Sequence, residues 1–393
     1  MKGGEDMKNA LRAISILAAF LLLLSGCGVE TPPVTTVPVT TTPPAATTAP
    51  VTTAPTVTEP VHTEPPVTQP QPEEVYVLSF AGDCTFGDNF DAEKEFGTFC
   101  KVVKDRYGYP LAGVKDIFQN DDYSLVNLEC ALTASDPTDA EMEELKENRF
   151  RFRGPAEYAQ ILVEGGVEFA SCANNHSRDY GKQGLYDTWD ALKAADIDFA
   201  SFGRSCVVTT ESGLNLGIFT VFFNTNRSTV ESQVKSLKNK GAEIIIMSIH
   251  WGDEGAYVPT RQQETLGRMA VDAGVNIVFG HHSHTLMPVE AYHGGIIYYS
   301  LGNFSFGGNR NPKDKDTAIL QQQVLRWPDG SVTLGPLSVV PCRISSVDNW
   351  NDYQPTLYTK EDAGYSRVLA KLEGTFEDYV VKEPETTAPS TPA

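Results

Sequence analysis

Several common functional signatures are missing from this chain of 393 residues. It has no G-x-x-x-x-G-K-[ST] phosphate-binding loop and no G-x-S-x-G nucleophile elbow, which argues against nucleotide-driven chemistry and against a serine hydrolase. Its 7 cysteines include no C-x-x-C pair, the usual spacing of a zinc-cysteine site. Basic charge is also scarce, because 31 Lys and Arg face 51 Asp and Glu and leave a net charge of −20. We therefore expect no nucleic acid among its partners.

The sequence also lacks an apolar run long enough to span a bilayer. The longest, Ala13–Leu24, has 12 residues and follows Lys8 and Arg12, as the apolar part of a signal peptide does. It ends in Leu-Ser-Gly-Cys, with Cys27 where a bacterial lipobox has its lipidated cysteine. We predict that residues 1–26 are a lipoprotein signal peptide and that Cys27 anchors the protein to the outer face of the cell membrane. The alternative is an ordinary secreted protein.

The composition divides the rest of the chain into three parts. After lipidated Cys27, the segment up to residue 72 is a linker rich in threonine and proline, which cannot bury enough apolar surface to fold. Residues 73–382 form one predicted domain without an internal repeat or a break rich in proline, glycine or serine. Residues 383–393 repeat the linker composition and are predicted to be a disordered tail. The six cysteines of the domain are widely spaced, and we interpret them as small buried hydrophobes rather than disulfides.

Short runs rich in valine, isoleucine and phenylalanine alternate with helical patterns in the domain, which predicts a layered α/β protein. The predicted strands are 74–81, 123–127, 167–171, 197–202, 216–223, 244–249, 275–279 and 296–300. Helices are predicted where apolar residues recur every three or four positions, for example after a capping box at Thr260–Gln263. From residue 318 to 340 the pattern alternates without helices, which predicts late antiparallel strands.

Polar clusters follow five of these strands directly, and they hold five of the 7 histidines. The clusters are Gly82-Asp83, Asn127-Leu128-Glu129, Asn174-Asn175-His176 with Asp179, His250-Trp251-Gly252, and Gly280-His281-His282-Ser283-His284. Side chains just beyond the carboxyl ends of parallel strands line the binding crevice of an α/β sheet. Imidazole is the commonest protein ligand for transition metals, so the pattern predicts a metal centre. In an extended backbone, His282 and His284 would point to one side and His281 away from it.

This order of motifs resembles the calcineurin-like metallophosphoesterases, and more closely the CapA (PgsA) family linked to poly-γ-glutamate capsule synthesis. The likeness extends from about Val77 to Phe306 and includes Tyr299-Ser-Leu-Gly-Asn-Phe304. It implies a four-layer αββα sandwich, metallophosphatase-like, around a site with one or two divalent transition-metal ions such as Mn, Fe or Zn. Such ions generate a nucleophile from water and stabilise developing charge.

The resemblance also assigns roles to individual residues. The implied metal ligands are Asp83, Glu129, Asn175, His250, His282 and His284. His176 would act as the acid near the leaving group, oriented by Asp179, although Asp179 could instead cap a helix. Asn303 would contact substrate or belong to a turn that supports the site. Arg151 and Arg153 could meet an anionic substrate or be solvated strand charges.

Two positions depart from the superfamily pattern. A histidine is expected two residues after the first aspartate, and this chain has Thr85 there. The bridging carboxylate is Glu129 instead of an aspartate. These departures predict that one metal position is weakened, so that one firmly held ion is expected before two.

Three functions remain open at this point. The first is a surface-anchored, metal-dependent hydrolase or transferase acting on poly-γ-glutamate or a related anionic envelope polymer. The second is a non-catalytic factor that binds the polymer or a membrane polyglutamate synthase complex. The third is a metal-dependent phosphodiesterase.

Overall fold

The computed structural model describes residues 71–90, 97–145 and 150–377. The predicted signal peptide, Cys27, nearly all of the linker and the C-terminal tail lie outside the described residues and remain predictions. Among the helices of the described part, none has the length and apolar character needed to cross a membrane.

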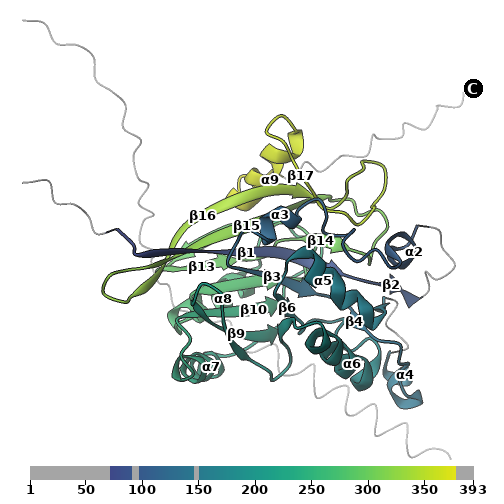
Figure 1. The fold of residues 1–393 in the computed structure, drawn as a ribbon, viewed down its shortest axis with the longest axis horizontal. Helices are drawn as coiled ribbons and strands as arrows, with labels where there is room; N and C mark the ends of the chain where they lie inside the picture. Colours follow the sequence, from purple (N-terminus) through teal and green to yellow (C-terminus); the bar gives the residue numbers. More distant parts are fainter. Residues whose placement is uncertain (1–70, 91–96, 146–149, 378–393) are drawn as a thin grey trace, which may run out of the picture. The chain divides into compact units, whose positions relative to one another are not determined.

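Two large sheets form the centre of the domain (Figure 1). The eight-stranded sheet has the order β17-β16-β15-β1-β3-β6-β7, with β14 paired to the end of β1. Its strands are β1 (Glu74–Thr85), β3 (Tyr123–Leu128), β6 (Phe169–Ser171), β7 (Asp198–Ala200), β14 (Asn303–Phe306), β15 (Asp316–Arg326), β16 (Val332–Arg343) and β17 (Thr356–Leu357). β1, β3, β6 and β7 are parallel, whereas β15 and β16 form the antiparallel pair predicted from the late alternation.

The six-stranded sheet has the order β12-β13-β11-β10-β9-β8. Its strands are β8 (Cys206–Thr209), β9 (Asn215–Phe222), β10 (Ile244–His250), β11 (Ile277–His281), β12 (Val289–Tyr292) and β13 (Gly295–Tyr298). The four central strands β9, β10, β11 and β13 are parallel. A small third sheet contains β2 (Asp88–Asn89), β5 (Phe152–Gly154) and β4 (Ala131–Leu132).

Three apolar clusters show that the layers are stacked in the order αββα. The middle cluster joins Leu78, Phe80 and Leu125 of the larger sheet to Ile246 and Phe279 of the smaller one, and all five are fully buried. The outer face of the larger sheet carries most of the helices before residue 200. They are α2 (Phe99–Val103), α3 (Lys115–Phe118), the 3₁₀ helix η2 (Ala156–Ala159), α5 (Gln160–Gly165) and α6 (Gly181–Ala194), with α4 (Asp139–Leu145) nearby.

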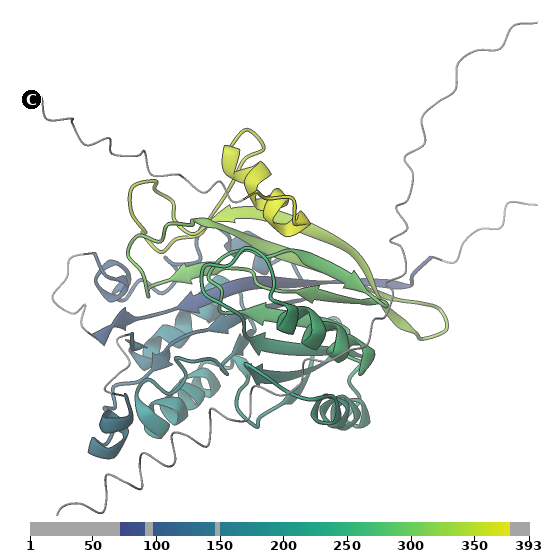
Figure 2. The ribbon, with the colours of Figure 1, turned by 180° about the vertical axis from the view of Figure 1, so that it is seen from behind.

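The outer face of the smaller sheet is covered by α7 (Arg227–Asn239) and α8 (Arg261–Asp272), which lie on the near side in Figure 2. The capping box predicted at Thr260 and Gln263 is present at the start of α8. A last helix, α9 (Ala363–Glu373), packs on β15 and β16. The predicted four-layer sandwich is therefore confirmed, and all eight predicted strands are found within a few residues of their expected bounds.

The six cysteines of the described residues are free, and four of them are buried. Burial raises the pKa of the Cys84 and Cys342 thiols to about 12. They therefore behave as small core side chains, as their spacing suggested.

Candidate metal centre

Five of the six predicted ligands, all except Asn175, meet where the carboxyl ends of the two sets of parallel strands face each other. Asp83 lies in β1, directly opposite Asn127 of β3 and Asn303 of β14. The residue before Asp83 must be glycine, because a Cβ on Gly82 would lie 2.0 Å from the carbonyl oxygen of Gly302. This close approach of two backbones fixes the position of Asp83 at the edge of the site.

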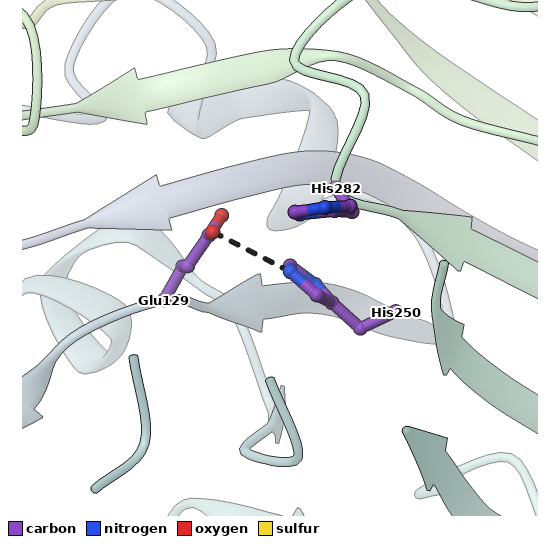
Figure 3. A group of neighbouring side chains, drawn as sticks. All are labelled: Glu129, His250 and His282. Atoms are coloured by element: carbon purple, nitrogen blue, oxygen red, sulfur yellow. Dashed lines mark ion pairs between the residues drawn. The ribbon is translucent and has the colours of Figure 1, made fainter. Parts of the chain in front are cut away.

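Glu129 is the residue shared by two groups of possible ligands. It follows β3 and has no exposed surface. One group joins it to His250, at the end of β10, and to His282, after β11, with all ligand atoms within 4.8 Å of one another. Figure 3 shows the glutamate and the two imidazoles pointing toward one another, with Oε1 of Glu129 3.5 Å from Nε2 of His250.

A second group contains Asp83, Glu129 and His284, again within 4.8 Å. Nδ1 of His284 lies 3.3 Å from Oδ2 of Asp83, and Nε2 lies 3.9 Å from Oε1 of Glu129. Glu129 is thus the residue common to both groups, and the bridging role that the resemblance implied for its carboxylate stays a prediction. A third group, of Glu254, His282 and His284, lies toward solvent, since Glu254 is exposed.

Buried polar atoms without hydrogen-bond partners gather at this point. They are both carboxylate oxygens of Glu129, both ring nitrogens of His250, Nδ1 of His282, Oδ2 of Asp83 and Oδ1 of Asn175. A buried oxygen or nitrogen without a partner is costly, typically by about 1–3 kcal/mol each. Their concentration on residues of metal-ligating type therefore fits a divalent cation, which would satisfy several of them at once.

The protonation states of the metal-free site follow from burial and like charge. Burial, reinforced by the neighbouring Asp83, raises the pKa of Glu129 well above its ordinary value. Burial, with the surrounding histidines, lowers the pKa of His250 well below its ordinary value, so this ring is neutral. Burial alone would lower the pKa of His284, but Glu129 and Asp83 raise it to about 9. The site thus contains a neutral His250 ring ready to ligate and a Glu129 carboxyl that would ionise when a cation is bound.

Side-chain amides of asparagines hold Asp83 and His284 in position. Nδ2 of Asn127 donates to Oδ1 of Asp83 at 2.8 Å, and Oδ1 of Asn127 accepts from Nδ2 of Asn174 at 3.1 Å. Oδ1 of Asn303 lies 3.0 Å from Nδ1 of His284, which leaves Nε2 of that ring directed toward Glu129. The contact of Asn303 with substrate stays a prediction; what the structure shows is its contact with a candidate ligand.

His176 has the geometry of an oriented acid. Its Nδ1 lies 2.7 Å from Oδ2 of Asp179, and its Nε2 lies 4.0 Å from Oε1 of Glu129. The ring packs on Phe152 at 4.3 Å between centroids, and the backbone N–H of Phe152 donates to Asp179 at 2.7 Å. The N-cap of α6 is Tyr180, which makes no side-chain cap hydrogen bond, and the choice between an orienting and a helix-capping role for Asp179 stays a prediction.

The expected geometry of the histidine run is also wrong. His282 and His284 have φ angles of +96° and +58°, so the backbone leaves the extended conformation as soon as β11 ends at His281. The turn, not strand alternation, brings both rings to the site. His281 does not point away: it is buried, with Nδ1 3.5 Å from Oδ1 of Asp83 and Nε2 3.1 Å from Oγ of Ser248.

Three further residues make contacts in or near the site that could not be predicted from the sequence. Glu254, four residues after His250, joins His282 and His284 at the mouth of the site. Thr85, at the position where a histidine was expected, donates through Oγ1 to the backbone carbonyl of Glu129 at 3.0 Å and so holds that residue. Arg151 is only 8% exposed, with its guanidinium 4.0 Å from the ring of Phe90, so it is not a solvated strand charge. The sequence does not show that Arg151 packs on Phe90, because the two residues lie far apart in the chain.

Comparison with known proteins identifies the family. The profile of the family "Bacterial capsule synthesis protein PGA_cap" matches residues 77–207 and 207–308. A capsule biosynthesis protein CapA from Bacillus anthracis is 30% identical over 314 residues, covering 70% of this chain and 74% of that protein. A PGA biosynthesis protein CapA from Bacillus subtilis is 28% identical over 289 residues, covering 68% and 72%.

A more distant relative is a probable polyglutamine synthesis accessory protein from Mycobacterium tuberculosis. It is 30% identical over 215 residues, covering 46% of this chain and 55% of that protein. The residues matched by the family profile, 77–308, contain every group of the candidate metal centre, from Asp83 to His284. This chain belongs to the bacterial capsule synthesis protein family PGA_cap, which includes the CapA proteins.

Proposed function

We propose that this protein acts in the synthesis or processing of poly-γ-glutamate, or a related anionic envelope polymer, as a metal-dependent hydrolase or transferase. Its family relatives carry capsule and PGA biosynthesis in their names. The observation that supports catalysis is the convergence of buried, unpartnered ligand atoms on Glu129. One or two ions of Mn, Fe or Zn would be held by the two groups that share this residue, and they would supply Lewis-acid chemistry there.

Residues of the chain itself would deliver the proton and position the ligands. Nε2 of His176 faces Glu129, while Nδ1 is held by Asp179. A proton on Nε2 can therefore be delivered to a leaving group bound between His176 and the carboxylates. Asn127 and Asn303 keep Asp83 and His284 in place, and Phe152 shields the His176 ring from water on one side. For a γ-glutamyl amide, the leaving group is an amine that must be protonated to depart.

The setting we propose is the outer face of the cell membrane. Cys27 would carry the lipid, and the threonine- and proline-rich segment would hold the domain away from the surface by roughly 100 Å or more. The polymer is one partner, and a membrane polyglutamate synthase complex is another. The name of the mycobacterial relative, a synthesis accessory protein, supports the second partner.

The decisive experiment measures metal and turnover together. Purified protein is analysed for bound metal beside a His250→Ala/His282→Ala double variant, and both are assayed on γ-glutamyl amides and an aryl phosphodiester. We expect one or two equivalents of metal and amide turnover, both lost in the double variant. His293→Ala is the control, because His293 is an exposed histidine that contacts Asp272 instead of the site.

Each of the other results points to a different function. Metal with phosphodiester turnover alone would favour a phosphodiesterase. No metal after reconstitution, with capsule restored in a deletion strain by the double variant, would favour a binding factor of the synthesis machinery.

A further inference from the structure

Phe223 has a backbone conformation that is unfavourable for its residue type. It follows the last residue of β9 and has a φ of +58°. The N–H of Asn224 donates to the carbonyl of Phe222 at 2.8 Å, so Phe223 is the central residue of a three-residue turn with positive φ. This is the rare and strained form of the γ-turn. Bulky residues at positive φ are true outliers, and they concentrate at binding and active sites.

The turn places the phenylalanine ring at the mouth of the metal centre. The backbone N–H of Phe223 donates to the carbonyl of His250 at 2.9 Å. Its ring meets that of His282 edge to face, with 5.5 Å between centroids. The side chain nevertheless remains 43% exposed. A strained backbone that holds a large apolar ring in solvent, against a candidate ligand, is unfavourable for the folded protein by itself.

A cation lies along the same wall of the site. The ring of Phe222 is stacked near that of His250, with 6.2 Å between centroids. The ring of Phe202 packs on Phe222 with 5.8 Å between centroids. The guanidinium of Arg178 lies 5.1 Å from the centroid of the Phe202 ring. Arg178 is exposed, and within residues 71–90, 97–145 and 150–377 its guanidinium contacts the ring of Phe202 and forms no ion pair. It is also two residues after His176. In a chain with net charge −20, an unpaired arginine next to the site is a local attraction for an anion.

We propose that Phe223 and Arg178 form a rim that binds an anionic polymer segment entering the metal centre. A γ-linked glutamate chain has two methylene groups in the backbone of each residue and one free α-carboxylate. The methylenes can pack on the exposed ring of Phe223, while a carboxylate pairs with Arg178. This inference rests on the proposed function and specifies how the same site would select its substrate.

The test measures the affinity of the full chain for a poly-γ-glutamate oligomer by calorimetry. Phe223→Gly removes the ring and suits the positive φ, and Arg178→Gln removes the charge. We expect each to weaken binding about five- to tenfold, the scale of a good interface contact, without loss of bound metal. Thermal stability of Phe223→Gly should equal or exceed that of the wild type, because the strain is relieved. Phe223→Tyr should retain the affinity.

Arg106→Gln is the matched control, because Arg106 is an exposed arginine at 4.3 Å from the ring of Tyr109, after α2. Wild-type affinity in both rim variants would overturn the inference and leave the proposed function intact. Loss of metal in Phe223→Gly would also overturn it, since the ring would then support His282. Failure of the wild type itself to bind the oligomer would overturn the polymer assignment together with the rim.

Discussion

At the scale of single residues, the site depends on which atoms are left without partners. Glu129 has two buried oxygens that no described donor satisfies, whereas Asp83 has one oxygen bound by Asn127 and the other 3.3 Å from Nδ1 of His284. Thr85 does not replace a ligand but holds the backbone of Glu129. At the position where the superfamily pattern has a histidine, this chain therefore has a hydrogen-bond donor that positions Glu129.

The role of Asp179 can be tested by Asp179→Asn. The amide keeps the shape of the side chain but removes the charge that holds Nδ1 of His176 at 2.7 Å. We expect kcat to fall by about 10²–10⁴-fold, as for loss of an oriented acid or base, with bound metal unchanged. The measurement is steady-state kinetics on whichever of the two proposed assay substrates, γ-glutamyl amides or the aryl phosphodiester, the wild type turns over, with metal analysis of the same samples.

Asp187→Asn is a suitable control, because Asp187 accepts hydrogen bonds from Thr133 and Ser135 on the outer helix layer. A kcat equal to that of the wild type in Asp179→Asn would remove Asp179 from the mechanism.

At the scale of secondary-structure elements, the site is assembled by parallel strands. β1, β3 and β6 deliver the residues from Asp83 to His176, and β10 and β11 deliver His250 and the histidine turn. Two successive strands of a parallel sheet end on the same side, which is why short polar clusters after each strand meet in space. The helices contribute by covering the outer faces, so their caps should affect stability without affecting metal binding.

Thr260→Ala tests this separation. Oγ1 of Thr260 accepts from the backbone N–H of Gln263, and the Gln263 side chain accepts from the N–H of Thr260, at the start of α8. Loss of this capping box should reduce the free energy of unfolding by about 1 kcal/mol. Urea denaturation measures the change, and metal content should remain that of the wild type.

Thr265→Ala, one turn later on α8, is the matched control, because its hydroxyl only donates to the carbonyl of Arg261 on the exposed side. A loss of metal in Thr260→Ala would show that α8 supports the site directly.

At the scale of the whole molecule, the candidate metal centre draws its residues from both sheets. Asp83 and Glu129 come from the larger sheet, while His250, His282 and His284 come from the smaller one. Removal of a bound ion would leave unpartnered carboxylates between the sheets, so metal should stabilise the entire sandwich.

We therefore predict that a chelator lowers the melting temperature. At a free metal concentration of about 100 times Kd, binding contributes about 2.7 kcal/mol, which corresponds to roughly 4 °C for a domain of this size. The effect should be larger at pH 8 than at pH 5.5, because the raised pKa of Glu129 makes protons compete with metal at low pH. Differential scanning calorimetry with and without chelator measures both effects.

The His250→Ala/His282→Ala variant should show no response to the chelator. A melting temperature of the wild type that is independent of metal at both pH values would contradict the view that the ion links the sheets.

The sequence by itself determined the layered α/β class, the bounds of the strands and the capping box of α8, because these depend on periodicity and on contacts between near neighbours. It also indicated the ligand types, since His250 and the histidine run follow apolar strands. The resemblance had suggested that Asp179 orients His176. Only the tertiary structure decided that Glu129 is shared by two groups of possible ligands, that His282 and His284 lie in a turn with positive φ, and that Phe223 lies in a strained turn beside His282. These features depend on distances between segments far apart in the chain and on turns with positive φ, which follow from packing of the whole sandwich and not from local sequence preference.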